Sequence, residues 1–201
     1  MTKQLLIIFV KNAVAGKVKT RLAATIGPEK ALEVYRVLLQ RTHDITLILP
    51  ISKAVYYSDF IEEDIWNPLF YEKYVQNGSD LGARMQHAFA AGFAAGFEQI
   101  CIIGSDCYEL TAPIISQAFE KLDNNDVVIG PAEDGGYYLL GMKKQNNAFF
   151  NGKTWSTSTV LQDTLNNVKD AGQTVALLPE LTDVDEEKDL ITIRENDFLK
   201  T

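Results

Sequence analysis

Residues 5–10 constrain the fold more strongly than any other part of the sequence, because all six of these residues are apolar. Two lysines, Lys3 and Lys11, bound this run. A strand with one face in water alternates apolar and polar residues, whereas a continuous apolar run is typical of a strand covered on both faces. The run therefore predicts a central strand of a mostly parallel sheet with helices on both sides.

Further strands and helices are predicted to alternate along the 201 residues. Strands are expected at residues 53–57, 70–75, 99–103, 127–129, 137–141 and 174–178. Helices are expected from Pro28 onward and at residues 81–97, 113–122, 158–171 and 189–196, with Thr111 as an N-cap. The end of the first helix stays open, because residues 45–49 also suit a strand. The alternation predicts a three-layer α/β/α fold in a single domain spanning residues 1–201.

The net charge of -8 argues against nucleic acid or a membrane surface as a partner, because both attract basic proteins. No apolar run is long enough to span a bilayer, and no cleavage site follows residues 5–10, so a cytoplasmic location is expected. Cys101 and Cys107 have neither zinc-site nor CxxC spacing, and we expect two packed, reduced thiols. His43 and His87 fall within predicted helices and are interpreted as structural.

Ligands of open α/β sheets bind beyond the carboxyl ends of the strands, and the loop after residues 5–10 is rich in cations. Lys11, Lys17, Lys19 and Arg21 follow one another within eleven residues. Lysine and arginine neutralise phosphate oxygens, and Gly16 allows the backbone to approach an anion closely. The loop lacks the Walker A pattern. Its position favours phosphate binding, with a solvated basic loop as the alternative.

Carboxylates follow two other predicted strands. Asp106 comes directly after residues 99–103 and is interpreted either as a magnesium ligand or as the residue of an Asx turn. Asp183 and Asp185 share one side if their segment is extended, and two such carboxylates need a cation or solvent. Because Glu186 and Glu187 follow, a solvated acidic segment is the alternative interpretation.

Two polar segments complete the set. Residues 130–138 contain a strong hairpin signal, within which Glu133 and Asp134 are candidates for contacts with hydroxyl groups or a metal. Asp80 precedes a predicted helix and is expected as an N-cap. The start of this helix, together with Arg84, is a candidate contact for a nucleotide.

Taken together, these segments resemble the DUF2064 family of uncharacterised glycosyltransferase A-type proteins, some of which are named as transferases associated with radical SAM or selenium-domain genes. The shared patterns are KxxxxGxVKTRLA, GSDLGxRM, GSDC, GPAEDGGYYLLG and DVDxxxDL, which extend from about Leu5 to Leu190. A more distant similarity is to the guanylyltransferases of molybdopterin and phospholactate activation. The resemblance implies a nucleotide-diphospho-sugar transferase (GT-A-like) fold.

The resemblance also implies roles by position. The residues expected to cradle nucleotide phosphates are Gly16, Lys17, Lys19 and Arg21. The residues expected to border the nucleotide are Asp80 and Arg84. The residues expected near an acceptor are Asp134, Gly135, Gly136, Tyr137 and Trp155. Mg²⁺ or Mn²⁺ is expected on Asp106 and Asp185, with Asp183 as the reserve ligand.

Three positions depart from the family pattern. Tyr108 stands where a proline is common after the GSDC cysteine, and the first loop lacks its usual proline near Val14. Glu186 replaces the threonine of a DVDT pattern. None of these changes removes an expected ligand, although Tyr108 can alter how Asp106 is presented.

The expected function is metal-assisted transfer from a nucleotide-phosphate donor to a small-molecule acceptor. Asp106 would act with Lys17, Lys19 and Arg21, the cations stabilising charge on the transferred or leaving phosphate. Nucleotidyl transfer is favoured, because a triphosphate donor explains the number of cations in the first loop. Glycosyl transfer from a nucleotide-sugar is the first alternative, and a nucleotide-binding module without turnover is the second.

Overall fold

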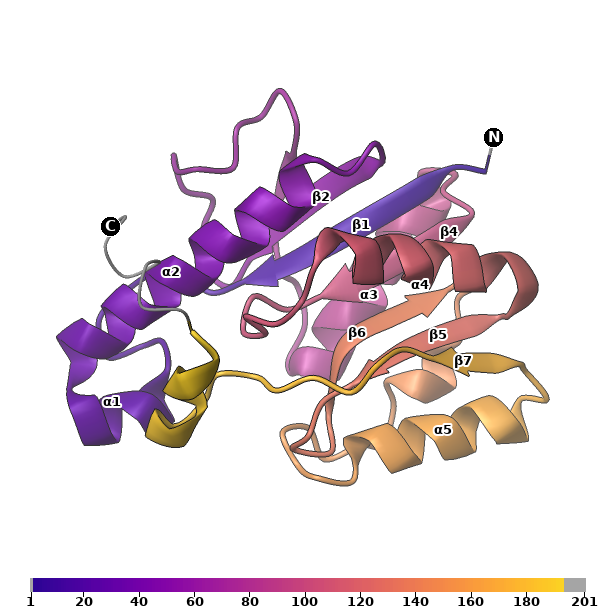
Figure 1. The fold of residues 1–201 in the computed structure, drawn as a ribbon. Coiled ribbons are helices and arrows are strands. Elements are labelled where there is room, and N and C mark those ends of the chain that lie inside the picture. The colour runs from indigo at the N-terminus through magenta and orange to yellow at the C-terminus, as the bar shows by residue number, and fades with distance from the viewer. Residues whose placement is uncertain (1, 194–201) are drawn as a thin grey trace.

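A computed structural model describes residues 2–193, which contain a seven-stranded sheet with strand order β3-β2-β1-β4-β6-β5-β7 (Figure 1). The strands are β1 Gln4–Val10, β2 Ser52–Tyr57, β3 Glu72–Val75, β4 Gln99–Ile103, β5 Val127–Pro131, β6 Tyr137–Met142 and β7 Val175–Leu177. The helices are α1 Thr20–Ile26, α2 Pro28–Leu47, α3 Leu81–Ala94, α4 Ala112–Asn124 and α5 Val160–Asp170, with 3-10 turns η1 Asn147–Phe149 and η2 Glu187–Thr192.

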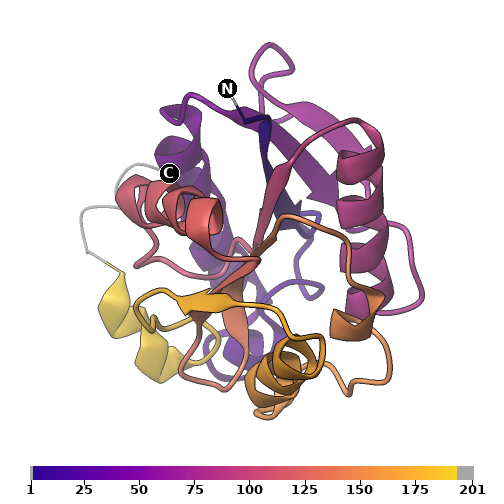
Figure 2. The same cartoon turned by 90° about the vertical axis from the view of Figure 1, so that its right-hand side faces the viewer.

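Helices cover both faces of the sheet, as the continuous apolar run predicts (Figure 2). In β1, Leu6 and Ile8 face a core shared with α2 and α4, whereas Leu5 and Ile7 face a core shared with α3 and α5. Each of these four side chains is buried. Burial on both faces explains why β1 shows no alternation of polar and apolar residues. The predicted three-layer α/β/α fold is confirmed.

Parallel pairing brings the carboxyl ends of β1, β2 and β4 to one edge of the sheet. β6 is the exception, because it runs antiparallel to both β4 and β5. The hairpin predicted within residues 130–138 produces this reversal. Its turn is closed by hydrogen bonds from the Ala132 N–H to the Gly136 carbonyl and from the Gly135 N–H to the Ala132 carbonyl. The turn therefore lies at the same edge as the loops after β1 and β4.

The hairpin turn requires glycine at position 135. Gly135 has a φ of 85°, and a Cβ at this position would lie 2.2 Å from the Ser158 carbonyl oxygen. The Gly135 carbonyl also accepts a 2.9 Å hydrogen bond from the Leu161 N–H. The turn is thus packed directly against the segment that leads into α5.

Several predicted boundaries were wrong. Helix α1 was not predicted, because it has only seven residues and only Leu22 among them is buried, which leaves no helical periodicity to detect. α2 continues to Leu47, which excludes a strand over residues 45–49. α3 ends at Ala94 and α5 spans Val160–Asp170, so both are shorter than predicted. β3 begins only at Glu72.

The ends of two predicted helices also differ from expectation. Thr111 occupies the N-cap position of α4, but its side chain makes no capping hydrogen bond. The helix predicted at residues 189–196 is the 3-10 turn η2 as far as Thr192, because Asp189 bonds back to the preceding backbone. Ile193 is the C-cap of η2, and residues 194–196 lie outside the described residues. Among the helices of residues 2–193, none has the length and apolar character needed to cross a membrane.

Candidate active site

A cavity of about 780 Å³ opens at the carboxyl edge of the sheet. Its wall is formed by the ends of β1 and β4, the loop before α1, the segment from residue 76 into the start of α3, the hairpin turn, the segment before α5 and the segment before η2. The last segment leaves β7 and runs across the molecule to the neighbourhood of α1, so the end of the described chain returns to its first loop (Figure 1). The five segments singled out in the sequence therefore meet at one edge.

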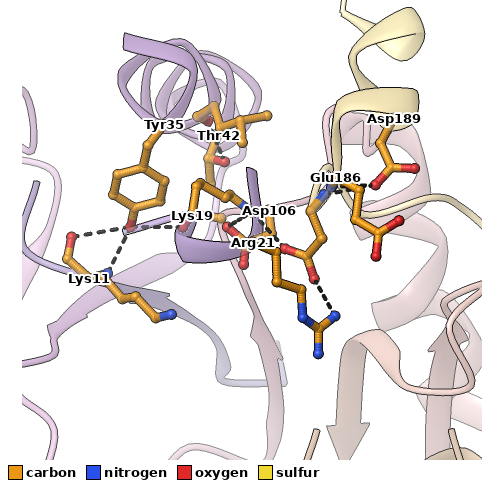
Figure 3. Close-up of polar contacts among 11 residues, drawn as sticks. Lys11, Lys19, Arg21, Tyr35, Thr42, Asp106, Glu186 and Asp189 are labelled. Carbon is orange, nitrogen blue, oxygen red and sulfur yellow. Dashed lines mark hydrogen bonds and ion pairs between the residues drawn. The ribbon is translucent and has the colours of Figure 1, made fainter. Parts of the chain in front are cut away.

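The centre of the site is a lysine between two aspartates. The Lys19 ammonium lies 2.7 Å from Asp106 Oδ1 and 3.2 Å from Asp185 Oδ1 (Figure 3). The Lys19 side chain is only 3% exposed, whereas each aspartate is 39% exposed. Burial by itself lowers the pKa of Lys19, but the two carboxylates outweigh it and raise that pKa above its ordinary value. Lys19 is therefore charged at neutral pH.

Lys19 reaches this position through an unusual backbone conformation. It is the residue before α1, and its φ of 47° lies in the left-handed region, which side chains other than glycine rarely adopt. On either side of it, Val18 and Leu22 are buried. These apolar anchors hold the loop while the lysine turns inward. Such conformations persist only where the surrounding structure enforces them.

The segment from Asp183 to Asp185 is extended, and its side chains alternate as predicted. Val184 is buried with residues of α1 and α2, while Asp183 and Asp185 both line the cavity. The Val184 N–H donates a 2.9 Å hydrogen bond to the Asp106 carbonyl, which ties this segment to the loop after β4. A backbone contact thereby brings the two candidate metal ligands together.

Asp189 holds the other end of this segment. Its Oδ2 accepts hydrogen bonds from the N–H groups of Asp185, at 3.0 Å, and Glu186, at 2.8 Å. Asp189 is buried, so these two bonds orient the backbone of Asp185 without exposing a further charge to the cavity. Asp189, the last aspartate of the DVDxxxDL pattern, is thus a positioning residue. Its place in the sequence does not reveal this role.

The donor set fits a divalent cation. One ammonium contacts both Asp106 and Asp185, so a single cation can reach both carboxylates. Burial, with added repulsion from Asp106, raises the pKa of Asp183 to about 7, and the attraction of Lys19 offsets this only in part. No group of three or more His, Cys, Asp or Glu side chains within residues 2–193 is arranged to hold a metal. Magnesium would therefore take few carboxylates, with phosphate oxygens and water as its other ligands.

The four cations of the first loop differ in their exposure to solvent. Lys11, Lys17 and Arg21 are exposed and line the cavity. The Arg21 side chain is 61% exposed, and its Nη1 lies 3.7 Å from Asp185 Oδ2 (Figure 3). Gly16 has a φ of 76° and shapes the loop without lining the cavity. Three of the four cations of the first loop therefore face the opening, and the fourth is buried between carboxylates.

Tyr35 joins the loop after β1 to the loop after β4. Its hydroxyl accepts a 2.8 Å hydrogen bond from the Lys11 N–H and lies 3.2 Å from Ser105 Oγ (Figure 3). Burial raises the pKa of Tyr35, which keeps the hydroxyl protonated and able to donate. The sequence presents Tyr35 only as a member of the apolar stripe of α2, so this role was missed.

On the other side of the cavity, Arg84 is held in place by the segment after β3. Its Nε donates to the Gly78 carbonyl and its Nη1 to Gln76 Oε1, each at 3.3 Å. The Gln76 amide in turn donates to the carbonyl of Tyr56 at 2.9 Å, at the end of β2. Asp80 caps α3 by accepting a hydrogen bond from the Ala83 N–H, as predicted, and does not line the cavity.

The residues predicted near an acceptor divide into two groups. Asp134, Tyr137 and Trp155 line the cavity, whereas Gly135 and Gly136 form the turn behind it. The Gly136 N–H donates a 2.8 Å hydrogen bond to Asp134 Oδ1, which orients that carboxylate.

Trp155 is packed against the first turn of α3. A Cβ on Gly82 would lie 2.4 Å from Trp155 Nε1, so only glycine at that position admits the indole. The Trp155 ring therefore lines the cavity directly beside the start of α3.

Charge is distributed unevenly over this lining. The described lining residues that carry a positive charge are Lys11, Lys17, Lys19, Arg21 and Arg84. From residue 102 onward, the described lining contains neither lysine nor arginine. The aspartates contributed by that part of the chain are Asp106, Asp134, Asp183 and Asp185. The described positive charges of the lining thus come from residues 11–84, which also contribute Asp59, and the later part of the chain contributes aspartates together with Tyr137, Tyr138 and Trp155.

Cys107 and Tyr108, which directly follow Asp106, are both buried in the hydrophobic core. Burial raises the pKa of Cys107 to about 12, so its thiol is not a nucleophile at neutral pH. Cys107 and Cys101 are both buried and reduced, as predicted. Tyr108 packs in the core formed by α1, α2 and η2, and the Arg41 guanidinium lies 5.4 Å from its ring centre. The departure from proline at this position therefore adds core packing.

The fold and the site define the class: the chain has the fold of nucleotide-diphospho-sugar transferases and nucleotidyltransferases. The model of the family described as "Uncharacterized protein conserved in bacteria (DUF2064)" matches residues 36–157, and the chain belongs to this family. No curated protein gives a significant match.

Solved structures agree with this assignment. A protein from Desulfovibrio desulfuricans G20, proposed to be a nucleotide-diphospho-sugar transferase, is 31% identical, with a TM-score of 0.87 over 98% of this chain and 88% of that chain. The inositol-1-phosphate CTP transferase from T. maritima is 15% identical, with a TM-score of 0.58 over 99% and 95%. Rv0371c from Mycobacterium tuberculosis H37Rv, in complex with manganese, is 12% identical, with a TM-score of 0.55 over 94% and 97%. The last two share the fold alone.

Proposed function

We propose that this protein is a metal-dependent transferase that moves a group from a nucleotide-phosphate donor to a small-molecule acceptor. The observation that carries the proposal is the convergence of Asp106 and Asp185 on one cation, at the mouth of a cavity whose rim holds Lys11, Lys17 and Arg21. Carboxylates that share a cation beside free lysine and arginine side chains suit a metal-bound polyphosphate. The 31% identical relative, itself proposed to be a nucleotide-diphospho-sugar transferase, supports the same class.

Asp106 and Asp185 would hold Mg²⁺ or Mn²⁺, with Asp183 in reserve. When bound, the ion would polarise phosphate oxygens and neutralise charge on the leaving group. Lys17 and Arg21 would bind the outer phosphates, because both are exposed on the same wall. These residues position the donor and stabilise developing charge, and no covalent intermediate on the protein is needed.

The residues of the lining support different places for the two substrates. Donor phosphates would bind beside the cations of the first loop, with Arg84 bordering the nucleotide. The acceptor would bind beside Asp134, Tyr137 and Trp155, where carboxylate oxygens can accept hydrogen bonds from hydroxyl groups. The reacting groups would then meet next to Asp106 and Asp185.

Two reactions are compatible with this arrangement. In nucleotidyl transfer, an acceptor oxygen attacks the α-phosphorus, the bond to the bridging oxygen breaks, pyrophosphate leaves, and the acceptor loses a proton. In glycosyl transfer, the acceptor oxygen attacks the anomeric carbon of the sugar, the bond from that carbon to the diphosphate oxygen breaks, a nucleoside diphosphate leaves, and the acceptor loses a proton. The exposed cations Lys11, Lys17 and Arg21 favour the first, since a triphosphate carries more charge to neutralise. The name of the 31% identical relative favours the second.

Thermal denaturation with nucleotides is the test of the proposed donor. We expect a magnesium-dependent rise in melting temperature with a nucleoside triphosphate, because a ligand at a hundredfold excess over its Kd adds about 2.7 kcal/mol to the free energy of unfolding. Chelator should remove the effect. A shift confined to nucleotide-sugars would indicate glycosyl transfer. Absence of a shift with every nucleotide would contradict the proposal, whereas binding without product from any acceptor would indicate a module without turnover.

Asp134 in the lining leads to a prediction about the acceptor. We expect an unphosphorylated acceptor to give at least about a tenfold higher kcat/KM than its own phosphate ester, because like charges placed together are disfavoured by several kcal/mol. Matched pairs such as myo-inositol and its monophosphate, or glucose and glucose 1-phosphate, provide the comparison. Asp134→Asn should narrow the difference within each pair. A higher kcat/KM for the phosphorylated member of each pair would show that the acceptor does not bind beside Asp134.

A further inference from the structure

Lys19 differs from the other cations of the cavity in its surroundings. Its side chain is 3% exposed and contacts two carboxylates, whereas that of Arg21 is 61% exposed and approaches only Asp185, at 3.7 Å. Lys17 is exposed on the rim. The left-handed backbone at Lys19 is maintained between buried anchors, so its inward direction is built into the loop.

A divalent ion and the Lys19 ammonium compete for the same place. Magnesium binds carboxylate oxygens at about 2.0–2.1 Å. An ion held between Asp106 Oδ1 and Asp185 Oδ1 would therefore overlap with the ammonium, which lies 2.7 and 3.2 Å from these two oxygens. Two positive charges in one such position repel each other strongly.

We propose that Lys19 is an internal counter-ion, which holds Asp106 and Asp185 together without metal and withdraws when a divalent ion binds. This inference rests on the proposed function, since it assumes that the metal binds these two aspartates. The lysine keeps the carboxylates close and neutralised, so that the metal site is formed before the metal arrives. The metal in turn has to displace a buried ion pair, which weakens its binding to the free protein.

Displacement of Lys19 links the metal to the donor. Once it leaves the aspartates, the ammonium needs another anionic partner, and phosphates bound beside Lys17 and Arg21 would supply it on the same wall of the cavity. Metal and donor would then each increase the affinity for the other, because such coupling is reciprocal. Lys19 would neutralise the carboxylates in the metal-free protein and the donor phosphates in the protein with metal and donor bound.

The test compares Mn²⁺ binding to the wild-type protein and to Lys19→Met without nucleotide, by calorimetry or by electron paramagnetic resonance of free Mn²⁺. Removing the competing ammonium should tighten Mn²⁺ binding about tenfold to a hundredfold, the factor that corresponds to hydrogen bonds with charged groups. Lys17→Met, the matched control, should leave Mn²⁺ affinity unchanged. Equal or weaker Mn²⁺ binding by Lys19→Met would overturn the counter-ion role.

A second measurement needs no substitution. Amine-reactive labelling of the wild-type protein, read by mass spectrometry, should modify Lys17 readily and Lys19 slowly in chelator. Mg²⁺ should increase the labelling of Lys19 several-fold and leave that of Lys17 unchanged. If Mg²⁺ binds and the labelling of Lys19 stays the same, the ammonium does not withdraw and the inference is wrong.

Asp185→Asn separates this inference from the proposed function. If Asp185→Asn leaves Mn²⁺ affinity unchanged, or the wild-type protein binds no Mn²⁺, the proposed metal site itself is wrong. If Asp185→Asn abolishes binding while Lys19→Met does not tighten it, the metal site stands and only the counter-ion role fails.

Discussion

Asp106→Asn is expected to lower kcat/KM of the transferase reaction by about a hundredfold to a thousandfold, as the loss of one charge-stabilising group at a reacting centre does in other enzymes. The substitution keeps the shape of the side chain and removes its charge. It would take one of the two carboxylates from the metal while Lys19 keeps its contact with Asp185. The loss should therefore appear in activity much more than in stability.

Product formation at saturating magnesium measures this effect, with thermal denaturation to verify the fold. Asp170→Asn is the matched control, because Asp170 is an exposed aspartate at the end of α5 and should retain full activity. An Asp106→Asn protein that works within a few-fold of the wild-type rate would rule out Asp106 as a metal ligand. The same substitution should weaken the magnesium-dependent thermal shift with a donor.

Gly135→Ala is expected to have the largest effect on stability, lowering the free energy of unfolding by about 3 kcal/mol or more. Two causes combine: alanine at positive φ is unfavourable by about 1–2 kcal/mol, and overpacking adds about 1–3 kcal/mol. The new Cβ would lie 2.2 Å from the Ser158 carbonyl oxygen, which is backbone and has little room to move. The turn that orients Asp134 would shift with it.

Gly172→Ala separates the two causes. Gly172 also has a positive φ, 63°, but a Cβ there would meet no atom within 4 Å. Its substitution should lower the free energy of unfolding by only about 1 kcal/mol. Urea denaturation of both variants gives the comparison. An equal decrease in the free energy of unfolding for both variants would show that a small shift removes the contact with Ser158. The hairpin would then not be held tightly against the segment before α5.

Much of the fold follows from local patterns. The unbroken apolar run of β1 indicates burial on both faces, and residues 130–138 carry the hairpin signal that reverses β6. These features depend on neighbours in the chain and can be read from spacing. Helix α1 and the 3-10 geometry of η2 cannot, because the first is too short for periodicity and the second depends on the hydrogen bonds of Asp189.

The candidate site divides in the same way. Cations after the first strand and aspartates after later strands mark the correct edge of the sheet, because parallel strands end together. The partners of those groups depend on contacts between distant segments. The Val184 N–H bond to the Asp106 carbonyl, for example, joins residues from the fourth strand's loop and from the end of the described chain. No spacing rule foresees it.

The sequence alone determined the layer architecture and the residue types available at the edge of the sheet, since both arise from periodicity and from the position of loops after strands. The tertiary structure alone decided that Lys19 lies between Asp106 and Asp185 and not with the other cations on the rim. The physical reason is that a buried ammonium needs partners that compensate its lost hydration, and the carboxylates that do so for Lys19 come from segments far away in the chain.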